Sequence, residues 1–344
     1  MYRELFIKDF SALGELLNNF ANGKKDLLLL SDAIEKSSKE NHLFSREMQI
    51  NSLKTISQHY LSKNELEEWT VEYESQILES ESVVSIIMAG NIPLVGFHDF
   101  LTTLASGRKA EIKLSSKDRY LLPAIVNTLC EINIYWRSRV EFCNYAGDNS
   151  TIVIATGGDD SASHFAQIFS NVPSIIRGSR SSIAVLSGKE SNNDISLLSD
   201  DMFLYYGRGC RSVSTIMLPA GCNINELAKR INLFSPYSED INFKDSYRYQ
   251  KAISVVAGEW YVDGEFFIFK KATTIPPPIG VIGVVWYSEV SDIDEFLESN
   301  SKSLQCVVNY CTSEGMIMFG EAQRPSLIDY ADGINCLEFI IKNS

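Results

Sequence analysis

The chain has 344 residues and 45% of them are hydrophobic, which is enough for one large or two medium domains with their own cores. Its net charge of −13 repels phosphate backbones and argues against nucleic acid as a partner. The apolar runs are too short to span a membrane and the amino end lacks a signal-peptide pattern, so we expect a cytoplasmic protein without a membrane span.

The first 80 residues have a helical pattern. Apolar residues recur at helical spacing in Phe10, Leu13, Leu16, Leu17 and Phe20, and Asn64–Leu78 continues in the same style. We therefore expect residues 1–80 to form a helical segment that packs on the domain that follows it.

From residue 81, short apolar strands alternate with helices. The first strand, Val83–Ala89, is followed by a helix expected at Pro93–Ala105. The pattern continues through Ala110–Leu114, Lys117–Ile132, Thr151–Ala155, Asp159–Phe169, Ser174–Ile176 and Ser182–Leu186. Such alternation predicts a parallel, doubly wound sheet in a domain of residues 81–195.

A second alternation of strands and helices starts near residue 196. It begins with an apolar, strand-like stretch at Leu197–Tyr206. It continues through Val213–Leu218, Asn225–Leu233, Ile279–Tyr287, Asp292–Glu298, Gln305–Tyr310 and Met316–Phe319. Asp263-Gly264 between two aromatic-rich runs predicts a hairpin. We expect a second α/β domain over residues 196–320, and a tail, 321–344, that returns to the core or reaches a partner subunit.

Cys210 lies in a glycine-rich turn, Gly207–Ser212 (GRGCRS). The glycines allow a tight turn that presents the thiol and its own N–H to a cleft. Arg208 and Arg211 flank the thiol, and nearby positive charge lowers a thiol pKa. The alternative is a buried structural cysteine, the usual fate of a free cysteine. The seven cysteines include no CxxC pair, which is typical of reduced intracellular thiols.

Asn91 follows the first buried strand, in the segment Gly90–Pro93 (GNIP). Ligands gather at the carboxyl edge of open α/β sheets, and an amide NH₂ there can donate to an oxyanion. The local pattern favours the alternative, in which Asn91 caps the next helix, because asparagine is a preferred N-cap residue.

Two further segments suit a phosphorylated ligand. Lys113 ends a strand and is followed by hydroxyls and a second lysine at Ser115, Ser116 and Lys117, although most such lysines are solvated strand ends.

The other segment, Thr156–Gly158 (TGG), joins a strand to a helix, where glycines let phosphate approach backbone N–H groups. It is not a GxGxxG motif, and Asp159 and Asp160 oppose a phosphate placed directly there. The four histidines show no metal-ligand spacing, so we expect no metal site; His98 and His164 are better explained as structural.

The order of these segments resembles the luminescence-type (LuxC-like) acyl-CoA reductases, a branch of the aldehyde dehydrogenase superfamily. The likeness covers roughly residues 80–340. It rests on AGNIPLVGFHDFL, AEIKLSSKD, IVIATGGDDSA, IIRGSRSSIAVL, FLYYGRGCRSVSTIMLP and, less specifically, GEAQRPSLIDYADGINCLEFI.

The resemblance implies an aldehyde-dehydrogenase-like fold, with two doubly wound α/β domains and an N-terminal helical layer. It makes residues 81–195 the dinucleotide-binding domain and residues 196–320 the catalytic domain. In aldehyde dehydrogenases the residue matching Asn91 helps to form the oxyanion hole, and the residue matching Lys113 contacts the cofactor ribose. The segment matching Thr156-Gly157-Gly158 lies by the dinucleotide, and Cys210 matches the catalytic cysteine.

Three departures from the family pattern are informative. Ile176 replaces the glutamate that activates water in hydrolytic members, and an apolar residue cannot do so. Ser116, followed by Lys117, replaces a glutamate of NAD-preferring members, which favours NADPH with NADH as the alternative. A second glutamate that contacts the nicotinamide ribose is absent around Pro278–Gly283.

We therefore expect an oxidoreductase that reduces a fatty acyl-CoA to an aldehyde through an S-acyl enzyme on Cys210. The alternatives are an acylating aldehyde dehydrogenase for short acyl-CoA or acyl phosphate, and a scaffold subunit of an acyl-reductase complex. Family members work with an acyl-protein synthetase, which makes such a synthetase a candidate partner. We also expect a homo-oligomer.

Overall fold

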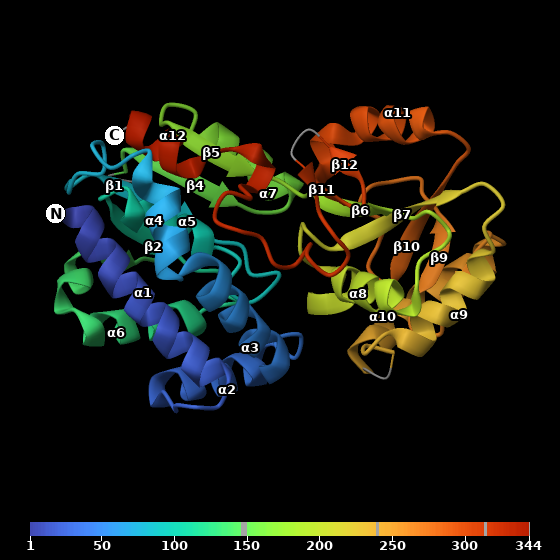
Figure 1. Ribbon diagram of the computed structural model, residues 1–344, viewed down its shortest axis with the longest axis horizontal. Coiled ribbons are helices and arrows are strands. Elements are labelled where there is room, and N and C mark those ends of the chain that lie inside the picture. Colours follow the sequence, from blue (N-terminus) through green and yellow to red (C-terminus); the bar gives the residue numbers. More distant parts are fainter. Residues whose placement is uncertain (146–149, 239–240, 313–314, 344) are drawn as a thin grey trace. The chain divides into compact units, whose positions relative to one another are not determined.

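The structure is a computed structural model that describes residues 1–145, 150–238, 241–312 and 315–343 (Figure 1). The chain divides into two compact units, Met1–Gly178 with Pro325–Ser344, and Ser179–Arg324. The observed boundary lies earlier than the expected position near residue 195. The strand Ser181–Val185 pairs with strands of the second unit, and a strand's own sequence does not specify which sheet it joins.

The first unit begins with the expected helices. Phe10, Leu13 and Leu17 of the first helix are fully buried on one face, as their spacing predicts. Serine hydroxyls cap two of the later helices: Ser45 accepts from Met48 N–H, and Ser62 accepts from Glu65 N–H. The elements are α1 (Tyr2–Ala21), α2 (Leu28–Glu40), α3 (Arg46–Thr55), a π-helical turn (Ile56–Tyr60) and α4 (Lys63–Val71).

Within the described part of the first unit, a five-stranded sheet has the order β3-β2-β1-β4-β5, and every neighbouring pair is parallel. This is the expected doubly wound arrangement, with its switch point between β1 and β4. The strands are β1 (Val83–Ile87), β2 (Lys109–Lys113), β3 (Val140–Phe142), β4 (Ile152–Thr156) and β5 (Ser174–Arg177).

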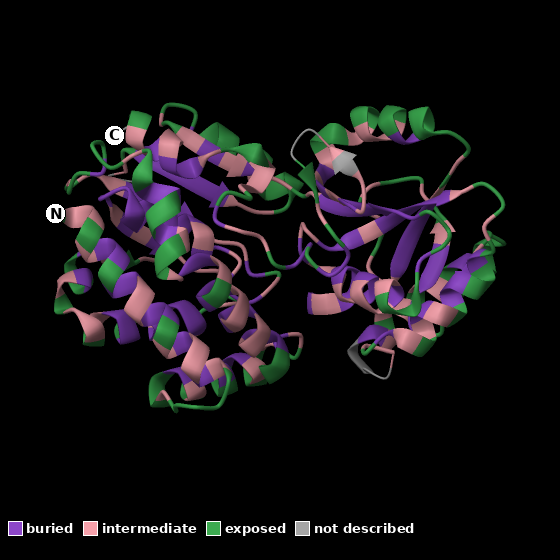
Figure 2. Cartoon of the chain, in the orientation of Figure 1, coloured by how far each residue is buried: buried purple, intermediate pink, exposed green. Residues whose placement is uncertain are grey.

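Helices cover both faces of this sheet, whose strands are mostly buried (Figure 2). Successive strand residues point to opposite faces. Ile86 packs in the large cluster that includes Phe10 and Phe100, whereas Ile87 packs with Phe169 on the other face. The helices are α5 (Phe97–Ala105), α6 (Leu121–Ile132), α7 (Asp159–Ile168) and, from the returning chain end, α12 (Cys336–Asn343).

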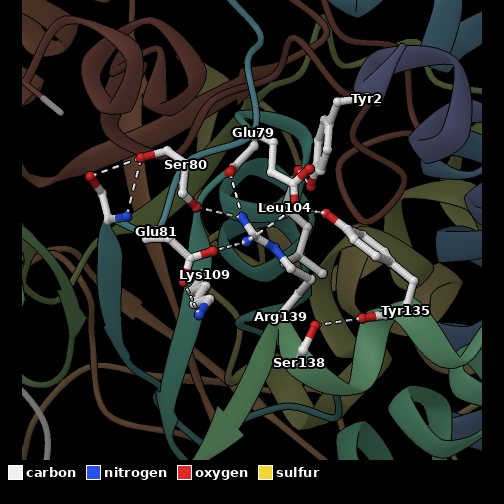
Figure 3. A network of polar contacts seen from close by, with 11 residues as sticks. Tyr2, Glu79, Ser80, Glu81, Leu104, Lys109, Tyr135, Ser138 and Arg139 are labelled. Carbon is white, nitrogen blue, oxygen red and sulfur yellow. Dashed lines mark hydrogen bonds and ion pairs between the residues drawn. The ribbon is translucent and has the colours of Figure 1, made fainter.

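Polar contacts join the amino edge of the sheet to the neighbouring loops (Figure 3). The buried Arg139 precedes β3 and donates to the carbonyl oxygens of Ser80 (2.8 Å) and Gly107 (2.5 Å). It also pairs with Glu81 at 3.3 Å. These contacts hold the starts of β1, β2 and β3 together at the amino edge of the sheet.

The second unit contains, among its described residues, a six-stranded sheet of order β11-β6-β7-β10-β9-β8. All neighbours are parallel except β8 and β9, which form an antiparallel hairpin closed by Gly264 N–H to Phe267 O at 2.9 Å. The hairpin expected from Asp263-Gly264 is confirmed. The strands are β6 (Ser181–Val185), β7 (Val213–Pro219), β8 (Val262–Asp263), β9 (Ile268–Lys271), β10 (Val281–Tyr287) and β11 (Leu304–Val308), besides the short pair β12 (Cys311–Thr312) and β13 (Gly315–Met316).

Helix α8 (Asn192–Phe203) overturns the strand expected at Leu197–Tyr206. A capping box at Ser191 and Asp194 starts the helix, and Ile195, Leu198 and Met202 then form one buried stripe at helical spacing. The long helix α10 (Ile241–Ala257) was not foreseen either. The remaining helices are α9 (Ile224–Phe234) and α11 (Val290–Asn300). None of the helices in the described part of the chain combines the length and the apolar character that crossing a bilayer requires.

Candidate active site

The carboxyl ends of three parallel strands lie level with one another in the first unit. Ile87, the last residue of β1, pairs with Lys113 of β2 on one side and with Ala155 of β4 on the other. Met88 N–H continues the ladder with a hydrogen bond to Lys113 O at 3.0 Å. This edge, at the switch point of the sheet, is where open α/β folds bind ligands.

Asn91 lies in the loop that leaves β1 at this edge, and it is exposed. Helix α5 begins at Phe97 with Gly96 at its N-cap, and not at Pro93 as expected. The interpretation of Asn91 as a helix cap is therefore wrong. Leu94 interrupts the expected helix because its φ is +59°, which lies in the left-handed region.

Asp118 holds this loop in place. Its Oδ2 accepts a hydrogen bond from Leu94 N–H at 2.7 Å. Its Oδ1 is buried and has no hydrogen-bond partner among the described residues. Burial raises the pKa of Asp118 to about 6, and the hydrogen bond from Leu94 opposes that rise. Sequence reasoning missed Asp118, although it ends the quoted segment AEIKLSSKD.

The loop after β2 packs against the loop after β1. A Cβ at Gly90 would lie 2.4 Å from Ser115 Oγ and 3.2 Å from Lys117 Cβ, so only glycine fits there. Ser115 also accepts from Lys117 N–H (3.3 Å), in a turn that delays the start of α6 from the expected Lys117 to Leu121. Ser116 and Lys117 are exposed. The structure thus brings the segment Ser115–Lys117 next to the residue that precedes Asn91.

The segment Thr156–Gly158 leads from β4 into α7. Gly157 N–H donates to Arg177 O at 3.1 Å. Gly158 is exposed at the N-cap of α7, and a Cβ there would meet no atom within 4 Å. The backbone at Gly158 is therefore open to a ligand, while Asp159 and Asp160 place negative charge in the first turn of the helix.

A buried ion pair, which sequence reasoning missed, lies beside Thr156. Arg177 pairs with Thr156 in the β4–β5 ladder, and its guanidinium donates to both oxygens of Asp99, at 2.7 and 3.1 Å. It also contacts Cys336 Sγ at 2.9 Å. Burial works against the charge of Arg177, but the Asp99 carboxylate raises its pKa above the ordinary value. Burial raises the pKa of Cys336 to about 12, so this cysteine stays a thiol that ties α12 to the sheet.

His98 has a structural role in the same unit. A ring nitrogen lies 3.0 Å from Leu327 O, and the ring packs edge-on against Tyr60 and Tyr330. Burial lowers the pKa of His98, which favours the neutral ring. In the portion of the chain that the structure describes, no three His, Cys, Asp or Glu side chains gather as metal ligands would.

In the second unit, Cys210 lies in a tight turn directly before β7. Ser212 N–H donates to Gly209 O (3.0 Å), and Gly209 N–H donates back to Ser212 Oγ (3.2 Å). The preceding Tyr205 and Tyr206 have φ of 58° and 57°, so the stretch expected as a strand is a sharp bend. Cys210 itself is half-buried.

Ser182 of β6 fixes the backbone of this turn through its hydroxyl group. Its hydroxyl donates to Cys210 O at 3.0 Å and accepts from Cys306 N–H at 3.2 Å. The Arg211 side chain is held as well, because Nε donates to Ala322 O at 2.6 Å. Burial lowers the pKa of Arg208. The turn is thus an ordered element of the second unit.

Comparisons with known proteins agree with this fold. A family model described as acyl-CoA reductase (LuxC) matches residues 18–233. Aldehyde dehydrogenase C from Pseudomonas syringae, solved as a point mutant with NAD+ and octanal, is 13% identical with a TM-score of 0.60, covering 91% of this chain and 78% of its own.

Two further structures share the fold. Betaine aldehyde dehydrogenase from Staphylococcus aureus, in a complex with NAD+, is 11% identical (TM-score 0.62; 89% and 76% covered). A 3,6-anhydro-L-galactose dehydrogenase in complex with NADP is 12% identical (TM-score 0.57; 94% and 87% covered). The search of curated proteins finds no match.

The family match spans more than half of the chain, and the two α/β units reproduce the aldehyde dehydrogenase fold. The expectations for family and fold class are confirmed. This chain belongs to the LuxC acyl-CoA reductases, a family of oxidoreductases, and it has the fold of the aldehyde dehydrogenases.

Proposed function

We propose that the chain reduces a fatty acyl-CoA to the aldehyde, through an S-acyl enzyme on Cys210 and with NADPH as reductant. The observation that carries the proposal is the ordered turn at Cys210, the residue that matches the catalytic cysteine of the superfamily. Its carbonyl is held by Ser182, and its neighbours Gly209 and Ser212 bond to one another. A side chain on so constrained a turn is suited to a fixed angle of attack.

In this proposal the Cys210 thiolate attacks the thioester carbonyl. The Asn91 side chain and the Cys210 N–H stabilise the tetrahedral oxyanion, and coenzyme A leaves as a thiolate that takes a proton from water. Asn91 is exposed and does not cap a helix, which supports a role toward a ligand. Reduction of the acyl enzyme gives a thiohemiacetal on Cys210, which collapses to the aldehyde and the free thiolate.

The residues at the carboxyl edge of the first sheet fit a dinucleotide. Gly158 leaves open space beside the backbone, where a phosphate could approach. Lys113 and Lys117, at the end of β2 and in the loop after it, offset the negative charge of the chain locally. The residues that would hold it are Lys113, Ser115, Ser116, Lys117, Thr156, Gly157 and Gly158. A bound reduced nicotinamide supplies the hydride for the second half-reaction. Ser116 and Lys117, in place of a carboxylate, favour NADPH over NADH.

Ile176 supports reduction over hydrolysis. It packs against an apolar cluster that includes Ile87, Val153 and Phe169. No proton acceptor stands at the position where hydrolytic relatives have their glutamate. An acyl group on Cys210 is therefore expected to await reduction, or exchange with a thiol.

The proposal is tested by NADPH consumption and aldehyde formation across acyl-CoA chain lengths, with NADH in parallel. We expect the highest kcat/KM with long-chain acyl-CoA and NADPH. Activity confined to short acyl-CoA or acyl phosphate would move the assignment to an acylating aldehyde dehydrogenase. If the intact protein gained no acyl mass with any acyl-CoA, a scaffold subunit would be the better description.

An acyl-protein synthetase as a partner, and a homo-oligomeric state, belong to the same proposal. Co-purification with a candidate synthetase tests the first, and light scattering of the purified protein tests the second.

A further inference from the structure

A loop far along the chain, Gly320–Arg324, is fastened to the end of helix α8 by one buried carboxylate. Asp201 is 0% exposed. Its Oδ2 accepts from Gly320 N–H at 2.7 Å, and its Oδ1 accepts from Ala322 N–H at 3.0 Å. Both oxygens are thus used to fix the backbone of a segment that has no regular secondary structure.

The same loop reaches the turn of Cys210 at two points. Gln323 Nε2 lies 3.2 Å from Ser212 Oγ and 3.3 Å from Asp201 O, so this amide joins the nucleophile turn to the end of α8. Ala322 O accepts from Arg211 Nε at 2.6 Å. Residues 211 and 212, which directly follow Cys210, are therefore both held by this loop.

We propose that Asp201 and Gln323 are positioning residues for Cys210: the carboxylate shapes the loop Gly320–Arg324, and Gln323 carries that shape to Ser212. The inference rests on the proposed role of Cys210 as nucleophile. It adds to the proposed chemistry the means by which the turn keeps its geometry while an acyl group is attached and removed.

The chemistry of Asp201 favours this role over simple filling of the core. A carboxyl buried at this depth costs free energy in its charged form, and an apolar side chain would fill the same space without that cost. The two N–H donors at hydrogen-bond distance offset part of the cost of burying the carboxylate. An apolar side chain could not accept these two hydrogen bonds. Gln323 likewise offers one NH₂ group to two acceptors, which fixes its orientation.

The test uses the full-length protein and iodoacetamide, without acyl-CoA or NADPH. The alkylation rate of each cysteine is followed by peptide mass, with Cys222 as the internal reference. We expect Gln323→Ala and Asp201→Asn to change the rate at Cys210 at least threefold and the rate at Cys222 less than twofold. In turnover assays kcat should fall about tenfold, the effect typical of one lost hydrogen bond, with KM for NADPH within twofold.

Asp200→Asn is the matched control. This neighbouring carboxylate accepts from the Tyr237 hydroxyl at 3.1 Å. Among the described residues, no hydrogen bond joins it to the backbone of the loop, and its interaction with Arg324 is electrostatic. It should leave the Cys210 alkylation rate within twofold of the wild type. Should Asp201→Asn fail to fold, Gln323→Ala decides, because it removes no charge.

The inference would be overturned if the folded variants showed the wild-type rate of alkylation at Cys210, whatever their melting temperature. Because alkylation needs no substrate, a wild type that fails to reduce acyl-CoA would refute the proposed function alone.

Discussion

The Asn91 loop in the first unit and the Cys210 turn in the second use the same structural device. The Asn91 loop follows β1 and the Cys210 turn precedes β7. A non-glycine residue with positive φ lies in or beside each of them: Leu94 in the loop and Tyr206 before the turn. An aspartate accepts backbone N–H in both regions: the half-buried Asp118 in the first unit and the fully buried Asp201 in the second. Carboxylates are strong acceptors, so they can hold backbone that neither helix nor sheet satisfies.

The two regions differ in how the aspartate is used. Asp118 bonds Leu94 through one oxygen, and its other oxygen is buried with no partner among the described residues. Asp201 uses both oxygens, and Gln323 and Ser182 add further bonds around Cys210. The Cys210 turn is thus held by several interactions that support each other. In the Asn91 loop, Asp118 holds Leu94 N–H and the Ser52 hydroxyl donates to Pro93 O at 3.1 Å.

The largest effect is expected from the proposed nucleophile, Cys210. Cys210→Ala should reduce aldehyde formation from acyl-CoA by about 10³-fold or more, because the covalent route is lost. The protein should also gain no acyl mass. Cys222→Ala, in the same unit, serves as the control and should keep both properties. A Cys210→Ala protein that still formed aldehyde would refute the scheme.

Asn91→Ala should reduce kcat by about 10²–10³-fold, the usual loss for one oxyanion donor. Its KM for NADPH should change little, and the rate of acyl transfer to Cys210 should fall along with kcat. Single-turnover acylation followed by quenched mass measurement separates the two steps. Normal acylation in Asn91→Ala would remove Asn91 from the oxyanion site.

The sequence predicted those parts of the site that depend on local pattern. The continuous apolar run of Val83–Ala89 predicted a buried strand, and β1 indeed ends level with Lys113 at the carboxyl edge of the sheet. The supporting carboxylates escaped notice because their partners are distant in sequence. Asp118 bonds Leu94, and Asp201 bonds Gly320. No local pattern distinguishes such an aspartate from an ordinary surface one.

The failures in the fold have a similar cause. The segment ending at Tyr206 has an apolar composition that suits a strand. Its first part is nevertheless helical, because a capping box starts α8 at Ser191 and one face of the helix is buried in the core. The membership of Ser181–Val185 in the second sheet depends on pairing with β7 and β11, which is a tertiary choice.

Asp118→Ala sharpens the comparison of the two aspartates. Loss of its bond to Leu94 should let the Asn91 loop move, and kcat should fall about tenfold with NADPH binding nearly unchanged. Asp118→Asn keeps an acceptor oxygen and should recover most of the activity. Equal losses in the alanine and asparagine variants would show that the charge matters and not the acceptor.

Gly90→Ala and Gly158→Ala compare a glycine that packs against the neighbouring loop with one that faces open space. A methyl group at Gly90 would strike Ser115, so the variant should lose about 1–3 kcal/mol of stability and bind NADPH several-fold more weakly. A methyl group at Gly158 meets no protein atom within 4 Å, so stability should hold while KM for NADPH rises. Urea unfolding and initial rates measure both quantities. An unchanged KM in Gly158→Ala would count against a phosphate at this helix end.

The smallest expected effect is a dependence of stability on pH that differs between the two aspartates. Burial raises the pKa of Asp201 to about 7, with a further rise from Asp200 and opposition from the Gly320 and Ala322 N–H groups and from Arg324. For Asp118 burial raises the pKa to about 6. In both cases the unfolded chain ionises first as pH rises, so the folded state loses stability from about pH 4 upward.

The loss should level off near pH 6 for Asp118 and near pH 7 for Asp201. Melting temperatures of the wild type, Asp118→Asn and Asp201→Asn between pH 4 and 8 test this directly. Each asparagine variant should lack its own part of the decline, a difference of a few degrees. If the Asp201→Asn curve ran parallel to the wild type between pH 6 and 7, this carboxyl would already be ionised there. The two regions would then differ only in the number of N–H groups that each aspartate holds.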